Sequence, residues 1–198
     1  MLISNYICAL DIGSSKISAS VALIKQKRIE NIFFETMPAK GISKGAIVDS
    51  IELVGALSGA LKNLKAKSGI NIKFVSANIS GQDIVTKHSH AIIPLAENGN
   101  KVITPSDVRK AIEQARILGS SLQEEIIHQI PFSYAIDSKS NLANPLGLYS
   151  HRLEIDLYLV CAKLSAVQSL THAINQAGYE IKNLFLSGLT EAEVIFNH

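Results

Sequence analysis

The sequence predicts an α/β fold interrupted by a smaller α+β insertion, and three observations lead to this fold class. Apolar or alternating runs at residues 6–12, 17–24 and 29–36 predict three consecutive strands. A helix and a further strand follow them, which is the start of an α/β sandwich. From about residue 82 the order changes to strand, helix, strand, strand over about 80 residues, a size typical of a small subdomain. We therefore expect one discontinuous domain, residues 1–82 and 163–198, with residues 83–162 inserted into it.

A capping signal predicts where the first helix begins. Asp49 precedes Glu52 by three residues, and Gly69 follows the last apolar position. Spacing of the apolar residues between them predicts one buried stripe. Its members are Ile51, Val54, Leu57, Leu61 and Leu64. Residues 72–79 are expected to form the strand after this helix.

Within the insertion we expect strands at residues 83–94, 124–137 and 152–162. Thr104 and Pro105 begin a helix that Gly119 ends. The residues predicted to share its inward face are Val108, Ile112, Ala115 and Leu118. The segment 138–150 reads as an exposed loop. After the insertion we predict a helix at 165–177, a strand at 179–186 and a last helix from Thr190.

Composition narrows the classes of function. The chain has 19 basic and 17 acidic residues, and no basic cluster accompanies aromatic residues, so we expect no nucleic-acid partner. Cys8 and Cys161 lie in separate apolar runs, as buried reduced thiols of a cytoplasmic protein do. The first residues lack a signal peptide, and no apolar run reaches the roughly 18 residues that span a bilayer. We expect a cytoplasmic protein.

One turn carries candidate chemistry. Asp11 ends an apolar strand, and Gly13, Ser14, Ser15 and Lys16 link it to the next strand. Successive N–H groups of such a turn can form a nest for phosphate oxygens, to which hydroxyls and an ammonium add donors. Asp11 would repel a polyphosphate unless a cation lay between them, and Mg²⁺ held through water satisfies both. The alternative interpretation is an ordinary hairpin with a polar tip.

The position of this turn resembles the first phosphate loop of the actin, Hsp70 and sugar-kinase superfamily. Within it, several segments resemble the FtsA family of bacterial cell-division proteins along nearly the whole chain. They are ALDIGSSK at 9–16, GISKGAIVD at 41–49, ANISG at 77–81, IHQIP at 127–131, NPLGL at 144–148, RLEI at 152–155 and QAGYEI at 176–181. The inserted unit occupies the place of the subdomain that this family calls 1C.

The resemblance implies an actin-like, ribonuclease H-like subdomain 1A with an inserted SHS2 subdomain 1C. It implies a protein that binds ATP with Mg²⁺ and forms head-to-tail filaments through residues 83–162. It also implies that the protein links FtsZ to the membrane at the division site and receives late division proteins such as FtsN through 1C. The phosphate-loop role transfers to Asp11, Gly13, Ser14, Ser15 and Lys16, with Asp11 holding Mg²⁺ through water.

The family's second phosphate loop, adenosine site, FtsZ-binding subdomain and membrane helix lie in a second half, beyond these 198 residues. A one-sided nucleotide site is expected to bind weakly. Gln168, at the start of the helix after the insertion, is the candidate to position a hydrolytic water. The alternative interpretation is an exposed helical glutamine without a role in catalysis. At most, weak ATPase activity is expected of the complete protein.

Three other functions stay open. The chain could be an interaction module whose phosphate loop is vestigial, or a related actin-like pilus-assembly protein of the PilM type. It could also be a sugar-kinase-like phosphotransferase, which the insertion disfavours. His88 and His90 lack a visible acidic partner and do not predict a zinc site. His128 is interpreted as a packed histidine, and Glu124 and Glu125 as a solvated strand entry.

Overall fold

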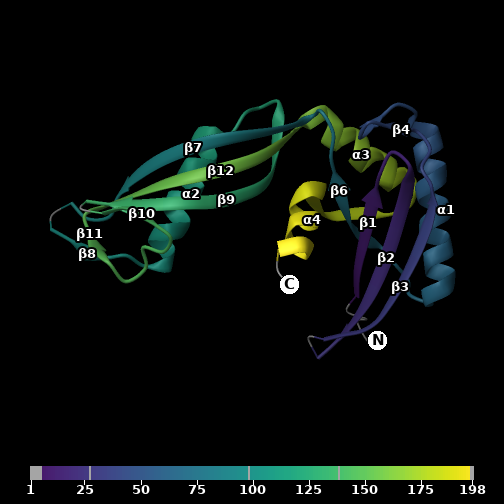
Figure 1. Cartoon of the computed structure of the whole chain (residues 1–198), viewed down its shortest axis with the longest axis horizontal. Helices are drawn as coiled ribbons and strands as arrows, with labels where there is room; N and C mark the ends of the chain where they lie inside the picture. Colours follow the sequence, from purple (N-terminus) through teal and green to yellow (C-terminus); the bar gives the residue numbers. More distant parts are fainter. Residues whose placement is uncertain (1–5, 27, 98, 138, 197–198) are drawn as a thin grey trace. The chain divides into compact units, whose positions relative to one another are not determined.

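The computed structural model describes residues 6–26, 28–97, 99–137 and 139–196. The chain divides into two compact units, one made of residues 1–84 and 163–198 and the other of residues 85–162 (Figure 1). Each unit has its own sheet and its own helices, and the α/β fold class with an inserted strand-helix-strand-strand unit is confirmed.

The first unit is built on a five-stranded sheet of order β13-β6-β1-β2-β3. Its strands are β1 (Tyr6–Ile12), β2 (Lys16–Lys25), β3 (Arg28–Pro38), β6 (Phe74–Ile79) and β13 (Glu180–Leu186). β1 pairs antiparallel with β2 and parallel with β6, and β6 pairs parallel with β13. The carboxyl ends of β1, β6 and β13 therefore meet at one edge of the sheet. A small hairpin, β4 (Ile42–Ser43) and β5 (Ala46–Ile47), precedes the first helix.

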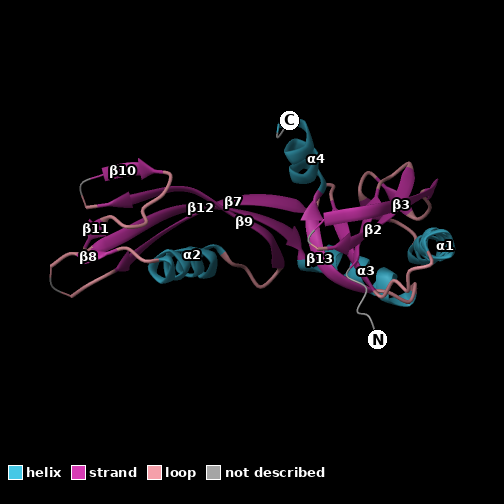
Figure 2. Ribbon diagram, turned by 90° about the horizontal axis from the view of Figure 1, so that it is seen from below, coloured by secondary structure: helices cyan, strands magenta, loops and turns pink. Residues whose placement is uncertain are grey.

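Two helices, α1 (Ser50–Ser68) and α3 (Leu164–Gln176), pack against this sheet and each other. Helix α4 (Ser187–Phe196) follows β13 and lies on the opposite side of the sheet from α3 (Figure 2). Period-2 alternation explains the covered face, because every second strand residue points toward α1 and α3. The strand residues buried there are Cys8, Leu10, Ile12, Ile17, Ala19, Val21, Val75, Ala77 and Ile79.

Helix α1 begins as its capping signal predicts. The Asp49 carboxylate accepts a hydrogen bond from the Glu52 N–H at 3.0 Å, and Gly69 closes the helix in the left-handed conformation. The predicted stripe is wrong at its first position, because the buried face starts at Leu53 and Ile51 is 86% exposed. Successive four-residue steps from Leu53 lead to Leu57 and Leu61, and Ile51 lies on the other side of that line.

The second unit is a four-stranded sheet of order β10-β9-β12-β7. Its strands are β7 (Ile84–Pro94), β9 (Glu124–Ile136), β10 (Lys139–Leu142) and β12 (Arg152–Lys163). Helix α2 (Pro105–Gly119) packs on one face through Ala111 and Ala115. The expected exposed loop at 138–150 is wrong in part: it contains β10 and β11 (Tyr149–Ser150), and β11 pairs with β8 (Lys101–Val102).

The predicted inward face of α2 is wrong only at its last position, because Ala115 is buried and Val108 and Ile112 pack against the core. Asp107, Ala111 and Ala115 are buried at four-residue intervals, whereas Leu118 is 61% exposed in the last turn. Asp107 is buried because it closes a capping box. Its carboxylate accepts hydrogen bonds from the Thr104 N–H and hydroxyl and from the Lys101 ammonium at 2.8 Å. The Lys101 ammonium and the Thr104 donors hold the pKa of Asp107 at about 2, below its ordinary 3.8.

This lowered pKa predicts a pH-dependent stability. Since the carboxylate is favoured in the folded state, its contribution is complete above about pH 4 and is lost as the pH falls through about 2. We expect Asp107→Asn to lower the free energy of unfolding of the inserted unit by about 1 to 2 kcal/mol at pH 7, the usual scale for a damaged cap. Urea unfolding at several pH values measures it. A difference from the wild type that stays constant down to pH 2 would contradict the assignment.

Candidate phosphate-binding turn

The turn after β1 is a closed two-residue hairpin. The Gly13 N–H donates to the Lys16 carbonyl at 3.0 Å, which leaves Ser14 and Ser15 at the tip. An added Cβ on Gly13 would lie 3.1 Å from that carbonyl oxygen, so the close approach favours glycine. Because the Gly13 N–H donates within the turn, the backbone N–H groups considered for an anion are those of residues 14–16.

The tip is tied to the segment that precedes α1. The Ser14 hydroxyl oxygen accepts a hydrogen bond from the Gly45 N–H at 3.0 Å, and the Ser15 carbonyl accepts one from the Ala39 N–H at 3.0 Å. The side chains of Ser14, Ser15 and Lys16 are exposed. The turn is thus held by its neighbours while its hydroxyls and its ammonium face solvent.

A glycine pair brings the tethering segment against the end of β6. Gly45 and Gly81 both have positive φ, 78° and 96°, and a Cβ on Gly45 would lie 2.8 Å from the Gly81 Cα. Side chains rarely adopt this backbone conformation, and here the space for one is filled by backbone. The two glycines therefore let residues 42–47 reach the hairpin tip.

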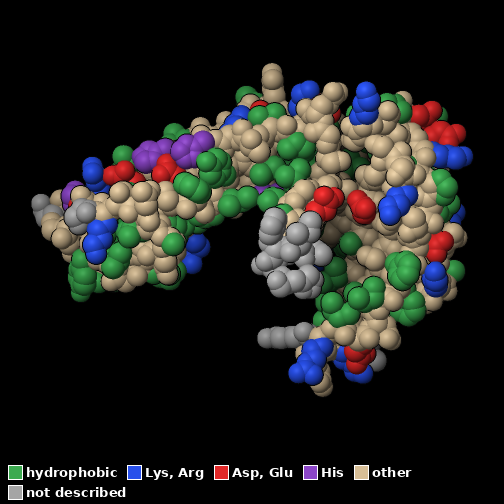
Figure 3. Space-filling model, viewed as in Figure 1, with side chains coloured by type: hydrophobic (Ala, Val, Ile, Leu, Met, Phe, Trp, Pro, Cys, Tyr) green, Lys and Arg blue, Asp and Glu red, His purple; other side chains and the backbone are tan. Residues whose placement is uncertain are grey.

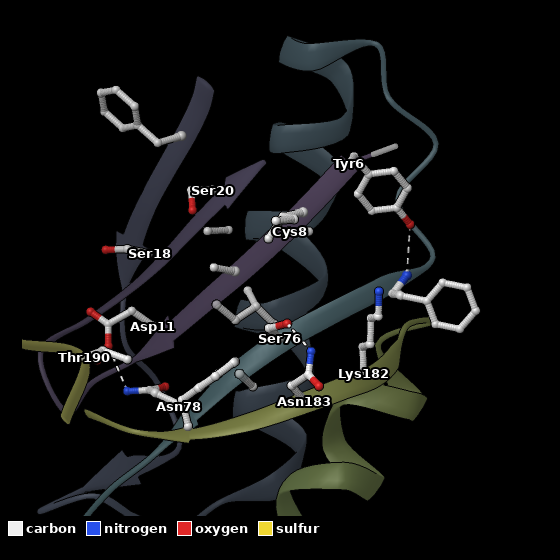
Figure 4. A pocket seen from close by; sticks show the side chains of 18 of the residues that line it. Tyr6, Cys8, Asp11, Ser18, Ser20, Ser76, Asn78, Lys182, Asn183 and Thr190 are labelled. Atoms are coloured by element: carbon white, nitrogen blue, oxygen red, sulfur yellow. Dashed lines mark hydrogen bonds between the residues drawn. The ribbon is translucent and has the colours of Figure 1, made fainter. Parts of the chain in front are cut away.

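Asp11 ends β1 beside this turn, and Asn78 on β6 organises it. The Asn78 side-chain amide donates to the Asp11 Oδ1 at 2.8 Å and to the Ser187 hydroxyl at 2.9 Å. Its carbonyl oxygen accepts the Ile12 N–H at 2.7 Å. Three strand ends, those of β1, β6 and β13, are joined by this one side chain. Figure 4 shows the Asn78 amide directed at the Asp11 carboxylate.

A cavity of about 1520 Å³ opens on the sheet face opposite α1 and α3. Asp11, Asn78 and Ser187 line it, and Thr190 and Glu191 line it further along α4. Small polar side chains from the middle of the strands line its floor. Among these are Ser18, Ser20, Ser76 and Asn183. Carboxylates, hydroxyls and amides at the carboxyl ends of parallel strands can together bind a polar ligand or a hydrated Mg²⁺.

The structure brings only some of the predicted residues to this cavity. Asp11 lines it, whereas residues 13–16 are not among its lining residues and form the exposed hairpin beside it. Gln168 is exposed on α3 and lines neither this cavity nor the smaller one of about 200 Å³ at the start of α3. Helix α4 supplies Ser187, Thr190 and Glu191 to the lining of this cavity. The residues that sequence reasoning missed are Asn78, Thr190 and Glu191.

Only one of the missed residues carried a sequence signal. Asn78 lies within the ANISG segment at 77–81, whereas nothing in the sequence pattern set Thr190 or Glu191 apart. Their relevance follows from the position of α4. Among the described residues, no group of three or more His, Cys, Asp and Glu side chains is placed to hold a metal ion. A Mg²⁺ ion would thus rest on Asp11, water and ligand oxygens.

Two other sequence interpretations need correction. His88 and His90 do have an acidic neighbour, because the Asp156 carboxylate lies 3.3 Å from His88 Nε2 and 3.0 Å from His90 Nδ1. Glu124 is not a solvated strand entry: its side chain is largely buried and forms an ion pair with Lys87.

Burial lowers the pKa of His128, in keeping with a packed histidine. Burial also raises the pKa of the Cys8 thiol to about 12, so this thiol stays neutral.

The fold defines the class of the molecule, an α/β protein with an inserted strand-helix-strand-strand unit. A solved structure described as the PilM-PilN type IV pilus biogenesis complex matches 96% of this chain and 49% of its own chain, with a TM-score of 0.54 and 15% identity. At that identity the likeness concerns the fold alone. In the part of the chain that the structure describes, none of the helices is long and apolar enough to cross a membrane.

The sequence comparisons are more specific than the likeness in fold. Residues 81–161 match the family described as "SHS2 domain inserted in FTSA". The cell division protein FtsA of Borreliella burgdorferi is 25% identical over 189 residues, 95% of this chain and 46% of that protein. FtsA of Streptococcus pneumoniae is 26% identical over 192 residues, 97% of this chain and 42% of that protein. The chain is similar to FtsA and spans about half the length of these relatives.

The glycine contact generates a stability prediction. Gly45→Ala places a methyl group against the backbone of Gly81 at a positive φ, so we expect it to lower the free energy of unfolding of the first unit by about 2 kcal/mol. Gly55→Ala is the matched control, because Gly55 lies inside α1 with open space around it, and there alanine should stabilise by up to about 1 kcal/mol. Chemical denaturation measures both variants. Equal stability of the two would refute the close approach.

Proposed function

We propose that this chain is the ATP-binding first half of an actin-like cell-division protein, in which the hairpin turn after β1 binds phosphate and Asp11 holds Mg²⁺ through water. The observation that carries this proposal is the exposed, tethered turn next to Asp11, at the edge where β1, β6 and β13 end. The N–H groups of residues 14–16, two hydroxyls and the Lys16 ammonium are donors suited to phosphate oxygens.

The side chains near Asp11 suggest which groups act on the bound nucleotide. Asp11 Oδ1 already accepts from Asn78, so its second oxygen is the one offered to Mg²⁺-bound water. Thr190 and Glu191 line the same cavity, and we propose them in place of Gln168 as the groups that contact water near the phosphates. A site with one wall leaves the nucleotide largely hydrated, so binding by this chain is weak.

The inserted unit is proposed to make the protein contacts. Its sheet is covered by α2 on one face, while the other carries an aromatic cluster: Phe132 and Tyr158 in edge contact at 5.3 Å, and His88 at 5.2 Å from Tyr158. Phe132 is 65% exposed. Figure 3 shows histidines and acidic side chains gathered on this unit. Exposed aromatic clusters are typical of protein interfaces.

Through this unit we propose head-to-tail self-assembly and the binding of late division proteins such as FtsN. Attachment to FtsZ and to the membrane at the division site is proposed for the complete protein, through segments beyond these residues. Two alternatives are an interaction module with a vestigial phosphate loop and a pilus-assembly protein of the PilM type. The interaction module predicts no response of the hairpin turn to Mg-ATP in the complete protein.

The nucleotide proposal predicts a localised NMR response. Titration of ¹⁵N-labelled chain with Mg-ATP should shift the amides of residues 14–16 with a dissociation constant near the millimolar range, about −4 kcal/mol. Asp11→Asn should make the affinity for ATP independent of Mg²⁺, and Lys16→Ala should weaken it by about tenfold. Lys182→Ala, which changes a lysine that lines the same cavity, is the control and should behave as wild type. Shifts scattered over the surface, or none at the turn, would favour the interaction module.

The contact proposal predicts a change in self-association. Phe132→Ser should weaken self-association of the chain about tenfold, ~1.4 kcal/mol, because the aromatic contact area is lost. Tyr149→Ser changes another exposed aromatic side chain of the same unit, outside the cluster, and serves as the control. Sedimentation velocity over a concentration series measures both. A monomeric wild type, or equal loss in both variants, would contradict this role for the aromatic face.

A further inference from the structure

Asn78 contacts three separate segments through one side chain. It is the second-to-last residue of β6, the strand that lies between β1 and β13. Its partners are the last residue of β1, the carboxylate of Asp11 and the first residue of α4. These partners are 66, 67 and 109 residues away in the sequence. The Asn78 side chain therefore links its own strand to β1 and to the start of α4.

The chemistry of the partners fixes the orientation of the amide. The Ile12 N–H can only donate, so it must face the Asn78 carbonyl oxygen, at 2.7 Å. The NH₂ group then faces the other way, and its two hydrogens go to Asp11 and Ser187 at 2.8 and 2.9 Å. Both donors of the amide are used, and a flipped amide would lose its hydrogen bonds with the Ile12 N–H and the Asp11 carboxylate.

Through these bonds the amide contacts two features of the site, the Asp11 carboxylate and the start of α4. Holding Asp11 Oδ1 sets the rotation of the carboxylate and leaves Oδ2 for another ligand. Holding the Ser187 hydroxyl fixes the first turn of α4, where the Thr190 hydroxyl also donates to the Ser187 carbonyl at 2.7 Å. Helix α4 contacts the remainder of the unit chiefly through β13. Its first turn therefore depends strongly on this link.

We propose that Asn78 is a positioning residue that couples the state of Asp11 to the docking of α4. A ligand that binds the Asp11 carboxylate weakens or reorients the hydrogen bond between Asp11 and the Asn78 amide. The change in the amide then alters its hydrogen bond with Ser187. The ligand part rests on the proposed nucleotide function. The structural part, the hold of Asn78 on α4, stands apart from it and is testable without any ligand.

The first test measures amide hydrogen exchange of the whole chain without ligand. Asn78→Ala should raise the exchange rates of residues 187–192 at least tenfold. Asn183→Ala removes a neighbouring amide in the same cavity, whose side chain bonds Ser76 at 3.3 Å, and should leave these rates within twofold of wild type. Unchanged exchange of α4 in Asn78→Ala would overturn the proposal.

The second variant separates positioning from bulk stability. Asn78→Asp keeps an acceptor for the Ile12 N–H and removes both donors, so the Ile12 amide should stay protected while α4 loses protection. Equal loss at Ile12 and α4 would indicate general unfolding of the strand ends and overturn the positioning role. Because this variant retains the strand contact, it also serves if the alanine variant fails to fold.

The third measurement adds Mg-ATP at millimolar concentration. In the wild type, exchange in residues 187–192 should change at least threefold on addition. In Asn78→Ala this change should vanish in α4 while the response of residues 14–16 persists. A ligand-induced change of α4 that survives in Asn78→Ala would overturn the coupling. A wild type in which neither segment responds would refute the proposed nucleotide function, and the ligand-free measurements would still decide the structural link.

Discussion

The two-sided pairing of β1 is the constraint on which the first unit depends. β1 pairs with β2 over all seven of its residues and with β6 on its other edge, where Ala9 lies opposite Ser76. Its register decides both the core and the site. A shift by one residue would turn Asp11 into the apolar core and Ile12 into solvent, because side chains alternate between faces. The register of β1 thus determines both the burial of Ile12 and the exposure of Asp11.

The same strand order explains why a polar cluster can exist beside an apolar core. Three parallel strands end at one edge, and each places a polar group just where its apolar run stops: Asp11, Asn78 and Ser187. Parallel sheets are ordinarily covered on both faces. Here α1 and α3 cover one face, and the other carries the cavity, so polar side chains on that face remain available to a ligand or a partner.

Helix starts were predicted correctly from the sequence, whereas contacts between distant segments were not. Asp49 and Thr104 predicted helix starts because a cap and its N–H partner are three residues apart. The pairing of Glu124 with Lys87 and the approach of α4 to Asp11 join distant segments that no local period encodes. Gln168 lines neither cavity, and its role as the residue that positions water stays a prediction. The family resemblance supplied the fold, while the geometry supplied Asn78.

The insertion is attached at a point where it cannot disturb this arrangement. Asp83, before the insertion, and Lys163, after it, are joined twice: the Lys163 N–H donates to the Asp83 carbonyl at 3.0 Å, and its ammonium contacts the Asp83 carboxylate at 2.7 Å. The first unit is thereby closed across the insertion.

The insertion has its own core, with Leu153, Leu157 and their neighbours packed on α2. Since each unit satisfies its own apolar face, substitutions on the exposed sheet of the insertion leave the register of β1 intact. A contact surface can therefore diversify there without altering the edge at which Asp11 lies.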